Sequence, residues 1–338
     1  MPTARPYTAL AALAVATALL FPPCTAAPDS VPPAPDAFSI AVFGDMPYIT
    51  GYKAPAPILR SYRNVLDDIN AHPAAFIVHA GDITNGPYRG DSVTVAHCNE
   101  LESMAHPLIY IFADSERTNC RRRGFDPPER LARLREVFTG GDQSLGSCKL
   151  TLERQSNNPT YALYRESVRW IMGNVLFPGL NVPGSNNNRG PDSLHPSPEY
   201  VARNPANLAW LREWFAMAAR KQMRGIAIFV QADPGFDRES MPPQSRRYFT
   251  GFNDLLATLR ELSIAFARPA LFVQGDSHYF MMGKPLLADS ATRRRLPNFT
   301  RAEGFGDRNY HWLRITADSA DPNLFRFDPM LVPKNLTQ

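Results

Sequence analysis

The stretch "LFVQGDSHYF", residues 271–280, runs from apolar residues into Gly275, Asp276 and His278. A short apolar run that stops at a turn residue is typical of a buried strand. Its polar end stands out because the chain has only seven histidines in 338 residues. Carboxylate and imidazole groups are metal ligands. The stretch therefore predicts a buried strand that ends in a candidate metal-binding loop, where the glycine lets the backbone turn close to an ion.

The same pattern recurs along the chain. Four other apolar stretches end on an aspartate, namely "FSIAVFGD" (38–45), "AAFIVHAGD" (74–82), "PLIYIFAD" (107–114) and "GIAIFVQAD" (225–233). With the opening stretch, the acids are Asp45, Asp82, Asp114, Asp233 and Asp276. Ligands gather beyond the carboxyl ends of parallel strands, so we expect these acids to converge on one rim. Buried carboxylates repel one another unless a cation holds them, which predicts a metal centre. The alternative is that Asp45 and Asp82 only cap turns after their strands.

Amphipathic helices are predicted between the strands. Residues 55–73 carry apolar side chains at helical spacing. The stretch 125–138 opens with Asp126 as N-cap, a proline at the first helical position and a glutamate three residues after the cap. The stretch 204–220 repeats the cap and proline, with Asn204 as the expected start.

Further strands are expected at 174–182 and, as an antiparallel pair, at "HWLRIT" (311–316) and "LFRFDP" (324–329). Strands that alternate with helices indicate an α/β fold. No second proline-rich break divides the rest of the chain, which predicts one large domain over residues 39–338.

The N-terminus has the features of a secretory signal peptide. A short basic start, an apolar stretch too short to span a bilayer and small residues near Ala26 predict a signal over residues 1–26. An uncleaved anchor is the alternative. Residues 27–38 are rich in proline and predict a linker. The mature chain is then expected in the periplasm or outside the cell, with no transmembrane segment.

Export makes disulfides possible, and the mature chain keeps Cys98, Cys120 and Cys148. Three cysteines cannot all pair. We predict a bridge between Cys98 and Cys120 with Cys148 free, while the other pairings stay open.

Five short motifs resemble, in order and approximate spacing, those of the calcineurin-like metallophosphoesterases. They are "GDMPY" (44–48), "GDITNG" (81–86), "ADSE" (113–116), "QADP" (231–234) and "GDSH" (275–278). The resemblance implies a two-sheet α/β/β/α sandwich and a centre of two metal ions. It also implies hydrolysis of phosphate monoesters or diesters, with a small molecule or a polymer as substrate.

Carried over by position, Asp45, Asp82 and His278 match the family's first acid, its metal-bridging carboxylate and its last histidine. Several positions depart from the family. Pro47, Ser115 and Asp276 stand where the family has histidine, Asp114 stands for an asparagine, and Gln231 or Asp233 takes the place of a further histidine.

The expected ligands are Asp45, Asp82, Asp114, Asp233, Asp276 and His278. A set so rich in carboxylates favours manganese or magnesium, with calcium as an alternative, over iron or zinc.

The family histidine that protonates the leaving group is replaced by Ser115, so Glu116, His79 or a metal-bound water is expected to supply the proton. The alternatives are an ion pair for Glu116 and a structural role for His79. In "GSNNNRG" (184–190), Asn186 or Arg189 could contact phosphate, although a solvated loop is equally consistent with these residues.

Two other classes compete with an enzyme. The lost histidines fit a catalytically degenerate protein that binds a divalent metal or a partner. The arginine runs at 121–123 and 293–295 fit a secreted module that grips polyanions. A net charge of +4 does not by itself indicate nucleic-acid binding.

Overall fold

The computed structural model describes residues 37–48, 55–84, 91–119, 124–190, 194–238, 241–289 and 292–336. The expected signal peptide, most of the linker, Cys120 and the arginine run 121–123 lie outside the described residues. The first strand, β1 (Ala37–Phe43), begins two residues before the predicted domain start at 39. Phe38 belongs to the fold because its side chain is buried and its ring meets that of Phe177 at 6.0 Å.

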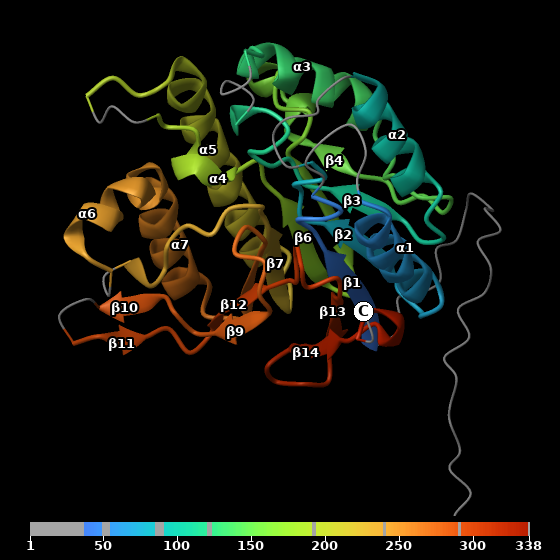
Figure 1. The fold of residues 1–338 in the computed structure, drawn as a ribbon. Coiled ribbons are helices and arrows are strands. Elements are labelled where there is room, and N and C mark those ends of the chain that lie inside the picture. Colours follow the sequence, from blue (N-terminus) through green and yellow to red (C-terminus); the bar gives the residue numbers. More distant parts are fainter. Residues whose placement is uncertain are drawn as a thin grey trace, which may run out of the picture.

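Two large mixed sheets form the centre of the molecule (Figure 1). The first has the order β14-β13-β1-β2-β3, and its strands β1, β2 and β3 are parallel. Its other strands are β2 (Phe76–His79), β3 (Leu108–Tyr110), β13 (Trp312–Asp318) and β14 (Phe325–Met330). The predicted C-terminal antiparallel pair is confirmed as β13 and β14, and β13 completes the sheet by pairing antiparallel with β1.

The second sheet has the order β4-β5-β6-β7-β8-β12-β9, and β6, β7, β8 and β12 run parallel. Its strands are β4 (Glu153–Arg154), β5 (Val168–Met172), β6 (Val175–Gly179), β7 (Gly225–Phe229), β8 (Ala270–Gln274), β9 (Met281–Gly283) and β12 (Phe299–Glu303). A separate ribbon pairs β10 (Leu287–Asp289) with β11 (Arg294–Arg295), so the second arginine run lies on an exposed ribbon outside the large sheets.

Helices cover the outer faces of both sheets. They are α1 (Ala56–Asn70), α2 (Asp91–Glu102), α3 (Pro127–Phe138), α4 (Gly184–Asn187), α5 (Pro198–Arg220), α6 (Pro243–Arg246) and α7 (Asn253–Phe266), with short 3-10 turns η2 (Gln155–Asn157), η3 (Pro159–Tyr161), η5 (Arg247–Phe252) and η6 (Pro333–Asn335). The cap of α3 is confirmed, since the Asp126 carboxylate accepts from the Glu129 N–H at 3.3 Å.

The predicted start of α5 is wrong. Ser197 caps the helix by accepting from the Tyr200 N–H at 3.2 Å, and Pro198 fills the first helical position. Pro205 therefore lies inside the helix. Asn204 does not cap it, because its side chain donates to Asp254 at 3.0 Å.

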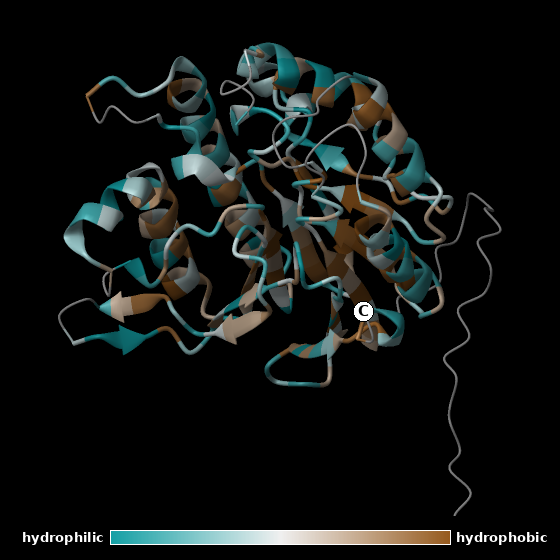
Figure 2. Ribbon diagram, in the orientation of Figure 1, coloured by the Kyte–Doolittle hydropathy of each residue, from teal (hydrophilic) through white to brown (hydrophobic). Residues whose placement is uncertain are grey.

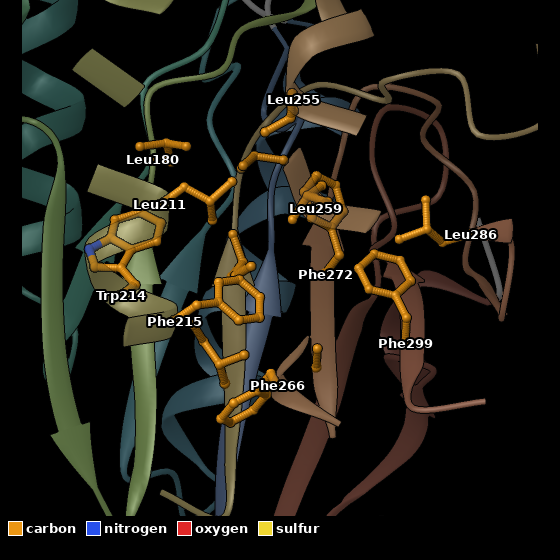
Figure 3. Packing of buried hydrophobic residues seen from close by; sticks show 14 of the residues in the cluster. Leu180, Leu211, Trp214, Phe215, Leu255, Leu259, Phe266, Phe272, Leu286 and Phe299 are labelled. Atoms are coloured by element: carbon orange, nitrogen blue, oxygen red, sulfur yellow. The ribbon is translucent and has the colours of Figure 1, made fainter. Parts of the chain in front are cut away.

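Three apolar layers hold these elements together as an α/β sandwich. One lies between the sheets, where Val42 and Val78 of the first meet Phe229 of the second. A second joins α1, α2 and α3 to the first sheet. The third joins α5 and α7 to the second sheet, and Figure 3 shows Phe215 of α5 between Trp214 on one side and Phe272 of the sheet on the other.

Figure 2 shows the hydrophobic residues concentrated on the central strands and the polar ones on the outer helix faces. Within the described residues, no helix has both the length and the apolar character needed to cross a membrane.

Candidate metal centre

The aspartates lie in loops directly beyond the strands of both sheets. Asp45, Asp82 and Asp276 have positive φ angles of 51°, 57° and 79°. Such conformations are uncommon for residues other than glycine and cluster at functional sites. A Cβ on Gly275 would lie 2.3 Å from Asp45 Oδ2, so only glycine lets the loop after β8 pass this close to the end of β1.

Three of the five acids converge. Carboxylate oxygens of Asp82, Asp114 and Asp276 all lie within 4.8 Å of one another, and we call these residues the acidic triad. Asp82 and Asp114 come from the first sheet, and Asp276 comes from the second. The triad thus sits where the strand ends of the two sheets meet.

Asp45 and His278 form a pair beside the triad. His278 Nε2 lies 3.5 Å from Asp45 Oδ1. The backbone N–H of Asp276 lies 3.2 Å from each Asp45 oxygen, which ties this pair to the triad. The ring of Tyr48 meets that of His278 edge to face at 5.0 Å.

Asp233, an expected ligand, turns its carboxylate away from the triad. Its Oδ1 accepts from the Gly235 N–H at 2.9 Å, and its Oδ2 lies 3.5 Å from Ser277 Oγ. Only the backbone N–H of Asp233 reaches the triad, where it donates to Asp276 Oδ2 at 3.2 Å. The Asp233 carboxylate therefore caps the turn at Gly235.

Neutral donors orient the triad. Ser115 donates to Asp82 through its N–H at 3.0 Å and its hydroxyl at 3.1 Å, so the residue in the family's histidine position positions a candidate ligand. Asn119 Nδ2 donates to Asp114 Oδ2 at 2.9 Å, and the Ser185 hydroxyl donates to the same oxygen. Among the described residues, no lysine or arginine forms an ion pair with the triad.

The charges of the triad are therefore not compensated within the described protein. Burial, followed by the charge of Asp114, raises the pKa of Asp82 and of Asp276 well above the usual range. Burial also raises the pKa of Asp45, and the hydrogen bond and charge of His278 offset this in part. Burial alone would lower the pKa of His278, but the contact with Asp45 raises it overall.

Neither expected proton donor has a side chain free for catalysis. His79 Nδ1 accepts from the Gly81 N–H at 3.0 Å, and Nε2 lies 3.2 Å from the Met46 carbonyl oxygen. Burial lowers the pKa of His79 to about 3, so the ring is neutral and structural. These contacts favour the structural alternative for His79, and its catalytic role stays a prediction.

Glu116 is also held in the core. Its Oε1 accepts from the Ile83 N–H at 2.6 Å and from the Tyr110 hydroxyl at 2.8 Å. Burial raises the pKa of Glu116. The residue lines a small cavity with Arg130 of α3, on the helix side of the first sheet. We therefore do not retain Glu116 as the proton donor.

The expected phosphate contacts also have structural partners. Asn186 Oδ1 accepts from the Gly251 N–H at 2.7 Å, and Asn186 Nδ2 donates to Thr250 at 3.3 Å, which fastens α4 to η5. The Arg189 carbonyl accepts from the Ser197 N–H at 2.8 Å, which ties its backbone to the start of α5. The contact with the triad comes instead from Ser185 of the same motif, which sequence reasoning missed.

The predicted disulfide is wrong. Cys98 is a free cysteine whose Sγ lies 3.5 Å from the Val137 carbonyl oxygen. Cys148, predicted to be free, is disulfide-bonded. The packing of α2 against α3 places Cys98 beside Val137. The order of the cysteines along the chain does not show this contact, so it could not decide which cysteines form the disulfide.

The triad fits a hard divalent ion on the chemistry of its donors. Its carboxylates, two buried and that of Asp276 partly buried, offer oxygen ligands and have no lysine or arginine partner in the described part of the chain, a combination that suits magnesium, manganese or calcium. Tyr48, part of the "GDMPY" motif, has no role in the sequence predictions but lies at this site. Burial, followed by the charge of Asp82, raises its pKa.

No protein-family model matches the sequence, and no curated protein matches it. Among solved structures, the chain is similar to a protein described as GAP50, the anchor in the inner membrane complex of Plasmodium. The TM-score is 0.46 at 11% identity, over 87% of this chain and 89% of that one. A similarity this low indicates neither a family nor a function.

Proposed function

We propose that the chain is a metal-dependent phosphoesterase of the calcineurin-like type, with the acidic triad as its metal centre. The observation that carries the proposal is the convergence of Asp82, Asp114 and Asp276 within 4.8 Å, from strand ends of two sheets and with no lysine or arginine of the described residues paired to them. The order of the five sequence motifs supports the substrate class.

The side chains of this site then have distinct roles. The triad carboxylates hold the ion, and Ser115 orients Asp82. A divalent ion held there would polarise the phosphoryl oxygens and lower the pKa of the attacking water. Tyr48 takes the role of the missing histidine, because its ring packs against His278 beside the triad and its phenol hydroxyl can donate to a leaving-group oxygen.

A second candidate function is metal binding without turnover. It is favoured by the engagement of Glu116 and His79, which leaves the site without either expected proton donor. The two candidates share the metal centre and differ only in catalysis, so one experiment separates them.

That experiment measures hydrolysis of a nitrophenyl phosphomonoester and a nitrophenyl phosphodiester by the mature chain. The protein is stripped with chelator and refilled in turn with manganese, magnesium, calcium and zinc. We expect turnover with manganese or magnesium, lost by at least about 100-fold in Asp82→Asn because a ligand of the ion is gone. Metal binding without turnover on either ester would instead establish the second candidate.

Asp233→Asn is the matched control for that variant. Sequence reasoning made both aspartates ligands, but the Asp233 carboxylate caps a turn outside the triad. An asparagine can accept the same hydrogen bond. Turnover should therefore stay within about threefold of the native rate, and a loss as large as that of Asp82→Asn would contradict this assignment.

Tyr48→Phe tests the proton donor while keeping the ring against His278. Phenyl phosphate has a poor leaving group, so its kcat should fall by about 100-fold. Nitrophenyl phosphate needs little protonation and should lose less than about threefold. Tyr279→Phe, at an exposed ring beside His278, should change neither rate. Equal losses on both substrates would show that Tyr48 acts only through the structure.

A further inference from the structure

We infer that Gln231 limits this centre to a single divalent ion, where the family resemblance implies two. The inference rests on the proposed metal site and concerns how many ions that site holds. Gln231 is fully buried and lies beyond β7, at the position where a histidine ligand was expected. Its amide bridges two members of the triad.

The amide group faces the triad as a donor. Gln231 Nε2 lies 3.1 Å from Asp276 Oδ1 and 3.4 Å from Asp82 Oδ2. An amide nitrogen has no lone pair to offer a metal, whereas its two N–H bonds point toward negative charge. The amide N–H groups therefore stabilise the negative charge of Asp82 and Asp276 on the side where a second cation would otherwise lie.

A backbone contact fixes this orientation. The Gly184 N–H donates to Gln231 Oε1 at 2.6 Å. Flipping the amide would set the NH₂ group against that N–H, donor against donor, in a buried position. A Cβ at Gly184 would lie 3.0 Å from Asp276 Oδ1, so a residue without a side chain lets the backbone N–H come this close to Gln231 and the triad. The oxygen that could have been a metal ligand is held away from the triad.

The remaining side chains favour one ion, because each oxygen of Asp82 and of Asp276 has already given at least one acceptor site to a hydrogen bond. Both oxygens of Asp82 and both of Asp276 already accept hydrogen bonds. Both Asp45 oxygens accept from the Asp276 N–H, and His278 faces one of them. Manganese and magnesium each prefer about six ligands. One ion can complete its shell with water, but a second would have to displace the Gln231 amide or separate Asp45 from His278.

The test counts bound manganese by equilibrium dialysis with metal analysis, and identifies isolated or exchange-coupled ions by electron paramagnetic resonance. The native chain should bind one isolated ion. Two coupled ions would overturn the inference and leave the proposed function standing. Binding of no ion would overturn both.

Two variants of Gln231 test the cause. In Gln231→Met no donor or ligand remains, so one ion should bind with unchanged or higher affinity. An affinity loss of about tenfold or more would instead show that Gln231 is itself a ligand. Gln231→Glu keeps an oxygen for the Gly184 N–H and adds one toward the triad, so it should bind two ions. One ion in that variant, with circular dichroism matching the native chain, would overturn the inference.

Discussion

Two buried charged clusters lie next to each other beyond the strand ends, and they are balanced in opposite ways. The acidic triad has no protein cation among the described residues, whereas the neighbouring cluster pairs Glu199 with Arg117 and Arg203. The two share one turn, since Arg117 follows Asp114 by three residues.

The titration of these groups shows what the difference means. Burial raises the pKa of Asp82, and its nearest charges raise it further. Burial would also raise the pKa of Glu199, but Arg203 and Arg117 hold it well below the usual range. Burial therefore does not decide whether a carboxylate is ionised here; the presence of a counter-charge does. The triad differs from the Glu199 cluster because no lysine or arginine of the described residues supplies a counter-charge to it.

The largest effect is expected from breaking the balanced cluster. Arg203 is fully buried and donates to Glu199 Oε1 at 2.6 Å, to the Asn181 carbonyl at 2.9 Å and to Asn187 Oδ1 at 2.8 Å. Arg203→Leu leaves Glu199 without this partner and should cost about 3–5 kcal/mol of unfolding free energy. Urea denaturation measures the loss.

The control for this variant lies on the same helix. Arg212 is exposed and meets Glu261 at 3.4 Å, so Arg212→Leu should cost at most about 1 kcal/mol. A loss in Arg203→Leu no larger than in the control would mean that the balanced cluster contributes little to stability.

The next largest effect comes from supplying the charge that the triad lacks. Manganese at about 100 times its Kd should stabilise the native chain by about 2.7 kcal/mol. Asp82→Asn should gain almost nothing, because it loses a ligand, while Arg212→Leu should gain as much as the native chain. Urea midpoints with manganese and with chelator give these gains. An equal gain in Asp82→Asn would place the binding elsewhere.

Much of this arrangement could be predicted from local sequence. Apolar runs that end on Asp45, Asp82, Asp114 and Asp276 are strands with an acid just beyond, because a strand is a local pattern and its end is marked by glycine or a polar residue. The cap of α3 at Asp126 was predictable for the same reason. Both of these confirmed predictions rest on neighbours in the chain, although the start of α5 at Asn204, predicted in the same way, was wrong.

The rest depends on contacts between distant residues. Gln231 faces the triad as a donor only because Gly184, 47 residues earlier, holds its oxygen. Cys98 lies beside Val137, which is 39 residues later, so its pairing could not be chosen from spacing alone. In both cases the decisive partner is distant along the chain, and the local sequence does not show that the two meet. Asp233 is different, because the Gly235 N–H that its carboxylate binds is only two residues away.

The smallest expected effect is on the stability of the metal-free chain, when one charge of the triad is removed. Asp114 is the largest charge contribution to the raised pKa of both Asp82 and Asp276, second only to burial. Asp114→Asn removes that charge, keeps the shape and lets an amide donate to the other two acids. In chelator at neutral pH, the variant should therefore be more stable than the native chain by about 1 kcal/mol.

The stability gain of Asp114→Asn should depend on pH. Asp82 and Asp276 have folded pKa values above the usual 3.8, so the folded chain binds protons that the unfolded chain releases. Their contribution to stability is complete below about pH 4 and is lost as pH rises through the folded values. The gain in Asp114→Asn should therefore vanish near about pH 4 and grow toward about pH 8 in thermal denaturation. Asp142→Asn, at an exposed site, should show no such trend. A pH-independent gain, or a loss at neutral pH, would mean that the triad is balanced by the protein after all, as the Arg203 cluster is.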